Sequence, residues 1–401
     1  MADECIASEG PLSITQRMRA LMPITRRWVY FDHAAVAPLP EPTRQAIQQW
    51  VDEATESGDV VWQQWSARLE EVRGAAARLI HAQPSEIALV PNTTTGISLV
   101  AEGFPWKEGD NVVTLENEFP SNQYPWMNLV SRGVEVRRVP VEGGVVDLER
   151  VAEACDARTR MVTLSWVGYA TGWRIDVREA AEMCHRRGCL LFLDAIQGLG
   201  LFPLDVTAEG VDFLAADGHK WLLGPEGAGI LYIRREHLDM LRPLFVGWNS
   251  VVQRSDYSRV ELRLRPEAAR YEGGSHNMVG FLGLGASLEM LLSLGVSPTQ
   301  SPLAEHVLAI TDRACQQLEA LGAVLHAPRI GRHRSGIVTF QLPGYESSFI
   351  RQRLQAAGIV ARCRAGGVRI SPHGYATEDE VARMIEVLRS LVTKSSDEPC
   401  R

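Results

Sequence analysis

The chain has 401 residues, too many for one small core, and this length predicts two domains or one large domain with a smaller satellite. Apolar residues make up 45% of it and charged residues 22%, as in an ordinary soluble protein. The net charge of −8, without a basic cluster, argues against a nucleic-acid partner, and no apolar run reaches the ~20 residues that would cross a membrane.

The beginning of the chain, MADECIASEGPLS, is acidic and lacks the apolar segment of a secretory signal peptide, so we expect a cytoplasmic protein. The cysteines are odd in number and form no CxxC pair, which indicates free thiols in a reducing compartment. No spacing of Cys and His matches a zinc site, and we expect no metal. The seven cysteines are Cys5, Cys155, Cys184, Cys189, Cys315, Cys363 and Cys400.

In chain order, residues 1–27 form a polar lead-in with one short amphipathic helix, and residues 44–80 carry a helical pattern of apolar positions. Short apolar runs then alternate with helical stretches. The runs predict strands at 86–90, 111–115, 134–139, 160–165, 189–194, 213–217 and 229–234. The predicted helices between them are 96–103, 122–132, 147–155 and 176–187.

Continuous apolar strands separated by helices predict an α/β fold, with a mainly parallel sheet covered by helices on both faces. The last two strands, 213–217 and 229–234, are joined without a crossover helix, so we expect one of them to run antiparallel. In open sheets of this kind, ligands bind at the carboxyl ends of the strands.

The pattern changes beyond about residue 285, where a long helix leads into a smaller α+β domain. The predicted elements there are helix 280–294, helix 303–321, strand 335–341, helix 346–357, strand 367–371 and helix 377–392. We therefore divide the chain into an N-terminal segment that packs with the small domain, a large domain, a small C-terminal domain and a disordered tail. Their ranges are 1–30, 31–285, 286–393 and 394–401.

Two charged residues follow predicted strands. Asp194 ends the run at 189–194, where a carboxylate lies at the mouth of the sheet; it is either a turn or capping residue or the partner of a buried cation. Lys220 follows the run at 213–217, in the Gly-rich segment AADGHKWLLGPEGAG. It is either a solvated loop residue or, because its flanks are apolar, a buried amine. Burial lowers the pKa of a lysine and makes it a nucleophile toward aldehydes.

The sequence Thr93, Thr94, Thr95, Gly96 follows another predicted strand and opens a helix. Free N–H groups at a helix start, with hydroxyls beside them, bind anions. The alternative is a simple helix cap.

Taken in order, a Thr-rich helix start, an aromatic residue after the sequence NE, then LDAIQ and DGHK closely resemble the class V aminotransferase family. These are fold-type I enzymes that use pyridoxal 5′-phosphate (PLP), and they include cysteine desulfurases, kynureninases and isopenicillin N epimerase-like proteins. The resemblance runs from YFDHAAVAPLP at 30–40 to VRISPHGY at 368–375, nearly the whole chain.

The resemblance implies a role for each matching residue around the cofactor ring. Lys220 would be the catalytic residue that carries PLP as an internal aldimine. Asp194 would pair with the pyridinium nitrogen and make the ring an electron sink. Gln197 would hydrogen-bond the phenolic oxygen of the ring, and Phe119 would stack on the ring face.

The resemblance also implies contacts at the phosphate and the substrate. Thr93 and Thr94 would hold the phosphate with help from His219. Ser275 falls where the partner subunit supplies a phosphate contact, which implies a homodimer with the active site at the subunit interface. Arg369 would bind the substrate α-carboxylate, a bidentate task suited to a guanidinium.

The sequence departs from the desulfurase pattern at three places. Asp217 stands where many desulfurases have a Ser on the phosphate, and we expect it to orient His219 instead. Trp166 stands where they have an Asn near the ring oxygen. The loop with the catalytic Cys is missing: only CRAGGV lies between Arg362 and Arg369, so we expect no direct sulfur transfer by Cys363.

The resemblance implies an amino-acid substrate that reacts at Cα, with Lys220 moving the proton. Family membership favours transamination; cysteine desulfuration or C–S lysis by β-elimination is the second hypothesis, and epimerisation the third. A dinucleotide-dependent oxidoreductase would need GxGxxG between a strand and a helix, which this sequence lacks. A non-catalytic scaffold or regulator with this fold fits poorly, because Lys220, Asp194 and the phosphate residues are all present.

Overall fold

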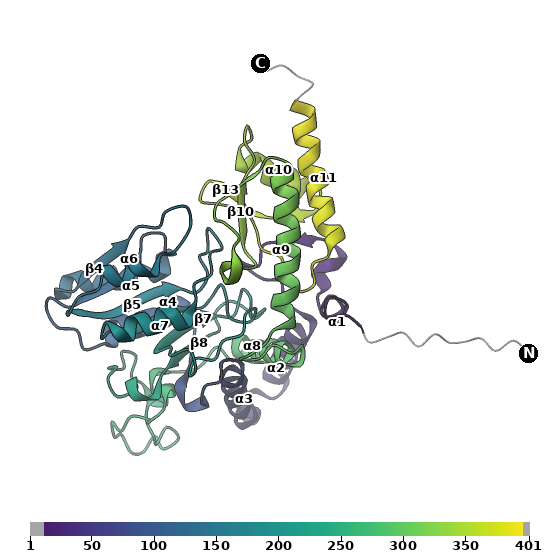
Figure 1. The fold of residues 1–401 in the computed structure, drawn as a ribbon. Helices are drawn as coiled ribbons and strands as arrows, with labels where there is room; N and C mark the ends of the chain where they lie inside the picture. Colours follow the sequence, from purple (N-terminus) through teal and green to yellow (C-terminus); the bar gives the residue numbers. More distant parts are fainter. Residues whose placement is uncertain (1–11, 396–401) are drawn as a thin grey trace, which may run out of the picture.

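The computed structural model describes residues 12–395; residues 1–11 and 396–401, with most of the predicted tail, lie outside the described part. Seven strands form one sheet in the order β2-β8-β7-β6-β5-β3-β4 (Figure 1). They are β2 (Ile87–Val90), β3 (Asn111–Leu115), β4 (Glu135–Val139), β5 (Thr159–Ser165), β6 (Leu190–Asp194), β7 (Phe213–Asp217) and β8 (Gly229–Ile233).

Only β8 runs against its neighbours. It is antiparallel to both β2 and β7, and all other neighbouring strands are parallel. The prediction that one of the last two strands runs antiparallel is therefore confirmed. Because β8 is reversed on both sides, β2 points the same way as β7, and six strands end at the same edge of the sheet.

Both faces of this sheet are covered. Along β6, Leu191 and Leu193 pack into one hydrophobic cluster and Phe192 into another on the opposite face. The first cluster includes α7 and the second includes α4, so helices lie on both sides. The inner strands of the sheet therefore appear in the sequence as largely apolar runs. The helices between the strands are α4 (Thr93–Gly103), α5 (Tyr124–Met127), α6 (Leu148–Glu153) and α7 (Val177–Arg186).

Two helices replace the single helical stretch predicted over 44–80: α2 (Glu41–Glu56) and α3 (Trp62–Ile80). The chain between them contains Gly58 at φ +56°, a conformation that ends the first helix. Both helices pack against α8 (Met278–Ser293), as Figure 1 shows. At this contact a β-carbon on Gly285 would approach the Cγ2 of Val72 to 2.6 Å, so the close packing depends on glycine.

A second, four-stranded antiparallel sheet has the order β12-β13-β10-β9. Its core is a separate hydrophobic cluster under three helices. The strands are β9 (Val324–Leu325), β10 (Val338–Gln341), β12 (Arg362–Arg364) and β13 (Gly367–Ile370), and the helices are α9 (Pro302–Ala320), α10 (Ser347–Ala356) and α11 (Glu378–Ser395). Near the N-terminus, α1 (Ile14–Ala20) contacts α9, and β1 (Val29–Tyr30) pairs with β11 (Ile359–Val360). The four-part division of the chain remains a prediction.

The strands of the large sheet form where the sequence predicts them, within one residue at each end. The helix predicted over 122–132 is wrong in part, because after α5 the chain continues as a 3-10 helix from Asn128 to Arg132. The short strands β1, β9, β11 and β12 were not predicted. In particular, the segment after Ala361 is not a free loop but one arm of the β12–β13 hairpin.

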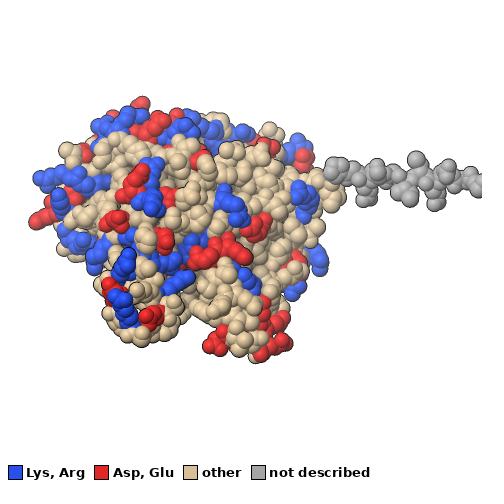
Figure 2. Space-filling model, turned by 90° about the horizontal axis from the view of Figure 1, so that it is seen from below, with Lys and Arg blue, Asp and Glu red and all other residues tan. Residues whose placement is uncertain are grey.

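Lys and Arg are interspersed with Asp and Glu on the face shown in Figure 2, without a region of a single sign. No helix among the described residues is long and apolar enough to cross a membrane. The same residues contain no cluster of three or more groups that could hold a metal ion. The five cysteines within the described range are all free thiols.

Candidate active site

Polar side chains gather at the edge where the parallel strands end. Asp194 ends β6 and Asp217 ends β7, and the strand register pairs Asp194 with Ser165 at the end of β5. Thr93, the first residue of α4, accepts a hydrogen bond from the Asp217 N–H at 2.9 Å. Four elements therefore converge at the carboxyl edge, where ligands bind in sheets of this type.

Lys220 lies in a turn at the start of the loop that joins β7 to β8. The N–H of Gly218 donates to the Ala228 carbonyl at 2.8 Å, and the N–H of Gly224 donates to the Gly218 carbonyl at 2.8 Å. A β-carbon on Gly218 would lie 2.7 Å from the Ala228 oxygen, so the turn requires glycine. Lys220 is only 8% exposed, and this burial lowers its pKa to about 8 against the opposing charge of Asp194.

An aromatic residue lies beside this amine. The Nζ of Lys220 is 5.5 Å from the ring centroid of Phe119, which follows β3. Phe119 meets the ring of Tyr169 edge to face, with the centroids 5.2 Å apart. The carbonyl oxygen of Tyr169 accepts a hydrogen bond from Nη1 of Arg369 at 2.9 Å. Through Phe119 and Tyr169, a series of contacts thus joins Lys220 to Arg369 on β13.

Arg369 is 1% exposed, and burial lowers its pKa to about 10. Its Nη2 lies 3.4 Å from Oδ1 of the buried Asp32, whose other oxygen is 3.0 Å from Nε of Arg362. The Nε of Arg369 is buried and has no hydrogen-bond partner in the described chain. The guanidinium therefore retains donor capacity for an anion from outside the protein.

Asp194 is 2% exposed, and burial raises its pKa to about 6. Its Oδ1 accepts the Ile196 N–H at 3.1 Å, while its Oδ2 has neither a hydrogen bond nor an ion pair among the described residues. Gln197 lies near the end of the same strand; its Nε2 donates to the Ala34 carbonyl and its Oε1 accepts from the indole of Trp221, both at 3.0 Å. One N–H of Gln197 remains for a ligand.

The start of α4 has the form of an anion site. The side chain of Asn92 caps the helix by accepting the Thr95 N–H at 2.8 Å. The hydroxyl of Thr94 donates to Ser121 at 2.8 Å. The early N–H groups of this 11-residue helix point out of its positive end, which favours a negatively charged ligand.

Asp217 and His219 lie together beside this helix start. The Oδ2 of Asp217 is 3.0 Å from Nδ1 of His219, the proximity that an orienting role for Asp217 needs. Neither Oδ1 of Asp217 nor Nδ1 of His219 has a hydrogen bond of good geometry in the described chain, although both atoms are buried.

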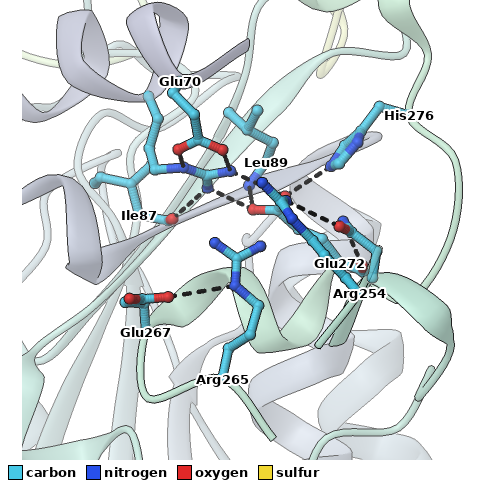
Figure 3. Close-up of polar contacts among 10 residues, drawn as sticks. Glu70, Ile87, Leu89, Arg254, Arg265, Glu267, Glu272 and His276 are labelled. Atoms are coloured by element: carbon cyan, nitrogen blue, oxygen red, sulfur yellow. Dashed lines mark hydrogen bonds and ion pairs between the residues drawn. The ribbon is translucent and has the colours of Figure 1, made fainter. Parts of the chain in front are cut away.

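Ser275 is not brought together with these residues. It is exposed and lies on a segment that a buried ion network holds to the large domain (Figure 3). In that network Glu272 contacts Arg73 at 2.5 Å and Nε2 of His276 at 2.6 Å. Against the effect of burial, the charge of Arg73 lowers the pKa of Glu272 to about 2. The network fixes the backbone on both sides of Ser275, which is itself exposed.

Cys363 lies on β12 and faces away from the arginines. The register of the hairpin pairs Arg362 with Arg369 and Cys363 with Val368. Side chains alternate between the two faces of a strand, and residues opposite each other share a face. Val368 is fully buried in the small-domain core, so Cys363 is directed toward that side and not toward Lys220.

The chain matches the family model of the class-V aminotransferases over residues 29–384, which is most of its length. The chain belongs to the class-V aminotransferase family. The predicted family is therefore confirmed, and with it the prediction of an enzyme. PLP is the cofactor of this family, as the sequence predicted.

Relatives that are named for an activity include cysteine desulfurases and an aminotransferase. A probable cysteine desulfurase of Methanothermobacter thermautotrophicus is 32% identical over 399 residues, covering 94% of this chain and 98% of the relative. An uncharacterized aminotransferase of Bacillus subtilis is 29% identical and covers 93% of this chain and 97% of the relative. Among solved structures, the apo cysteine desulfurase of Thermococcus onnurineus has a TM-score of 0.86 at 26% identity, covering 96% of this chain and 100% of that one.

These similarities confirm the predicted fold class, a fold-type I class-V enzyme. The same similarities do not confirm the predicted reaction. The sequence favoured transamination, and that hypothesis is not confirmed; the names of the relatives support the desulfurase alternative better.

The geometry fits PLP. Its phosphate needs hydrogen-bond donors, its ring nitrogen needs an anion and its aldehyde needs an amine. The start of α4, the free oxygen of Asp194 and the buried amine of Lys220 meet these three needs at one edge of the sheet. Three buried polar atoms without a hydrogen-bond partner in the described chain, Oδ1 of Asp217, Nδ1 of His219 and Nε of Arg369, belong to this same site.

Some residues that shape this class-V site were not predicted. Asp32 anchors Arg369, and Tyr169 contacts both Arg369 and Phe119. Trp221 and Ala34 orient Gln197. Glu118 accepts hydrogen bonds from the N–H and hydroxyl of Ser165, and its burial raises its pKa to about 7. The only sequence signal for them was their position next to motif residues, such as Trp221 after Lys220.

Proposed function

We propose that this protein binds PLP on Lys220 and cleaves the C–S bond of cysteine or of an S-substituted cysteine. The observation that carries the proposal is the buried amine of Lys220, which lies beside Phe119 and is connected through Tyr169 to the carboxylate-binding Arg369. The desulfurase relatives support sulfur chemistry. When bound, PLP supplies an aldehyde for the substrate amine and a ring that accepts the electrons released at Cα.

Lys220 acts as the base at Cα in this proposal. A lysine with a pKa of about 8 is partly neutral near neutral pH, whereas an ordinary lysine is almost wholly protonated. The neutral amine takes the Cα proton, and the electron pair of the Cβ–S bond leaves with the sulfur. Water then releases pyruvate and ammonium, so the overall reaction needs no oxidant or reductant.

Arg369 and Asp194 position the two partners of the reaction. Arg369 binds the substrate α-carboxylate, held in place by Asp32 and by the Tyr169 carbonyl. Asp194 keeps a negative charge beside the ring nitrogen, where Oδ2 is free to accept a hydrogen bond. The phosphate is bound by Thr93, Thr94 and His219 at the start of α4.

A second subunit completes the phosphate site in this proposal. Ser275 is exposed, and the neighbouring segment 245–262 carries several exposed apolar side chains. Asn249 of this segment donates to the Glu272 carbonyl at 3.0 Å, which joins it to the Ser275 loop. Its exposed apolar residues are Phe245, Val246, Trp248, Val252, Tyr257, Val260 and Leu262. An apolar surface of this kind marks a protein–protein interface, and it supports a homodimer. The free thiols support a cytoplasmic protein.

The reaction products test the proposed function. We expect purified holoenzyme to form pyruvate and a reduced sulfur compound in equal amounts from cysteine or an S-substituted cysteine, without an added 2-oxo acid. Sulfide or thiol and pyruvate are measured in the same samples. Turnover that requires a 2-oxo acid and yields the corresponding amino acid would instead establish transamination, the second candidate, which the Bacillus relative's name favours.

The position of Cys363 predicts that the chain carries no persulfide in the reaction. Its side chain is directed to the small-domain core and not toward Lys220. Cys363→Ala therefore removes no group that reaches the substrate and should retain activity within about twofold, the size of the effect of a substitution remote from any special feature. Mass spectrometry of the intact protein after turnover should find no added sulfur. An inactive Cys363→Ala variant that retains its cofactor, or a persulfide on this residue, would show that sulfur passes through the chain.

A further inference from the structure

Three arginines share one face of the small-domain hairpin. Arg362 is opposite Arg369 in the register, and Arg364 is two residues beyond Arg362 on the same strand. Alternation along a strand therefore places Arg362, Arg364 and Arg369 on the same side. The hairpin turn consists of Ala365 and Gly366, both at positive φ, which is the tight two-residue form that fixes strand register.

These three positive charges have one negative partner. Asp32 forms ion pairs with Arg362 and Arg369. Arg364 forms no ion pair in the described chain, and its only hydrogen bond runs from Nη1 to the carbonyl of Cys363 on its own strand, at 3.0 Å. It is half-buried, so its charge is only partly solvated. An unpaired guanidinium in that position is available for an anion.

The other groups on this face are not acidic. Thr339 is opposite Arg369 on β10, and its hydroxyl is buried without a partner. His326 adjoins Gly367, where a β-carbon would lie 2.8 Å from its Nε2. Asp32 is thus the one carboxylate paired with the arginine cluster among residues 12–395.

Arg364 also lies close enough to the reaction centre for its charge to act there. Arg369, on the same face, contacts Tyr169, and Tyr169 contacts the Phe119 ring beside Lys220. Burial is the main cause of the lowered pKa of Lys220 and of Arg369, and the positive charge of Arg364 lowers both further. Arg364 is therefore part of the same electrostatic environment as the proposed catalytic amine.

We propose that Arg364 binds a second anionic group of the substrate, and that the protein prefers S-substituted cysteines whose sulfur substituent contains an anionic group, such as a carboxylate or a sulfonate. In the proposed function Arg369 binds the substrate α-carboxylate. Arg364 then binds the anionic group at the far end of the substrate side chain. Cystine and S-sulfocysteine belong to this class. This inference deepens the proposed function and rests on it for the position of the substrate.

The chemistry is the same elimination with a different leaving group. The Cα proton passes to Lys220, the Cβ–S bond breaks, and its electron pair leaves on the sulfur that bears the anionic substituent. With water, the products are pyruvate, ammonium and the sulfur leaving group, which is thiocysteine from cystine and thiosulfate from S-sulfocysteine. Arg364 stabilises the departing group because the leaving sulfur gains negative charge next to the anion that it already binds.

The test compares Arg364→Gln with the wild-type holoenzyme on charged and neutral substrates. Loss of the Arg364 charge near Lys220 acts on all substrates alike, so the measured quantity is the preference between them. We expect kcat/KM for cystine and S-sulfocysteine to fall about tenfold or more relative to S-methylcysteine and cysteine in the same variant, through the loss of a charge-assisted contact. Arg351→Gln is the control. Arg351 lies on α10, which packs against both strands of the hairpin, and among residues 12–395 its side chain hydrogen-bonds only Gln355. It should leave both substrate groups unaffected. An equal loss on all substrates, an unchanged preference or a loss of cofactor from Arg364→Gln would overturn the inference.

A binding measurement separates this inference from the proposed reaction. Titration of the holoenzyme with aspartate, glutamate and alanine, followed by the change in visible absorbance, needs no C–S cleavage. If no substrate is cleaved but the dicarboxylates bind more tightly than alanine, and Arg364→Gln removes this difference, the proposed function fails and the anion site stands. If C–S cleavage occurs without any preference for charged substituents, the proposed function stands and the anion site fails.

Discussion

Lys220→Ala should abolish multiple turnover and the visible absorbance of the covalently bound cofactor. The physical reason is that the reaction needs an amine both to hold the cofactor aldehyde and to move the Cα proton, and the site offers one amine at 8% exposure beside the Phe119 ring. Addition of an external amine should restore at most a small part of the rate, because it lacks the fixed geometry of the side chain. Absorbance spectra and steady-state assays measure both effects.

The small number of lysines in the chain makes it easy to identify the one that carries the cofactor. The sequence contains three lysines, Lys107, Lys220 and Lys394. Borohydride reduction of the holoenzyme followed by peptide mapping should find the cofactor on Lys220 alone. Lys107→Ala is the matched control, since Lys107 is exposed and lies in the turn before β3, and this variant should keep the wild-type spectrum and rate. Modification of Lys107 or Lys394 in place of Lys220 would refute the site.

The lowered pKa of Lys220 predicts that the rate at which apoprotein binds PLP rises with pH. Attack on the cofactor aldehyde needs the neutral amine, which increases as the pH rises through about 8. Reconstitution of apoprotein with PLP should therefore accelerate between about pH 6.5 and pH 8.5. An ordinary lysine would still gain in rate well above that range.

The sequence predicted the large sheet well because all of its strands except the edge strand β4 are buried on both faces. A run such as that of β6 has no polar alternation to interrupt it, and the run itself marks the strand. The strands that were missed, β1, β9, β11 and β12, have two or three residues each. A pattern needs more positions than that to show a period. The residues of β12, Arg-Cys-Arg, also lack any apolar preference for one side.

The site was predicted in part for a similar reason. Asp194 and Lys220 follow buried strands, so their place at the carboxyl edge follows from local sequence. Contacts between distant segments do not: Asp32 and Arg369 lie 337 positions apart, and only the folded chain brings them to within hydrogen-bonding reach. The direction of Cys363 likewise depends on the register with β13, which the hairpin fixes and the sequence alone does not reveal.

Asp194→Asn should lower kcat by several powers of ten and leave the fold intact. The buried carboxylate keeps a negative charge next to the ring nitrogen and so keeps that nitrogen protonated. Asparagine has a similar shape and can still accept the Ile196 N–H, at 3.1 Å in the wild type, but it cannot supply the charge. Each factor of ten in rate corresponds to only ~1.4 kcal/mol, so the loss of a buried charge interaction can produce a change of this size. Near-normal turnover would mean that another group protonates the ring.

The same carboxylate should control how cofactor binding depends on pH. Burial raises the pKa of Asp194 to about 6 in the protein without cofactor, so the group is charged above that pH and neutral below it. Pairing with a cation requires the charged form, and PLP affinity should therefore weaken as the pH falls through about 6. Asp194→Asn should lose this dependence, while Asp205→Asn, which changes a carboxylate paired with His81 on the surface, should keep it together with the normal rate. Equilibrium titration of apoprotein at pH 5 and pH 7.5 measures the difference, and an equal dependence in the wild type and Asp194→Asn would place the pairing charge elsewhere.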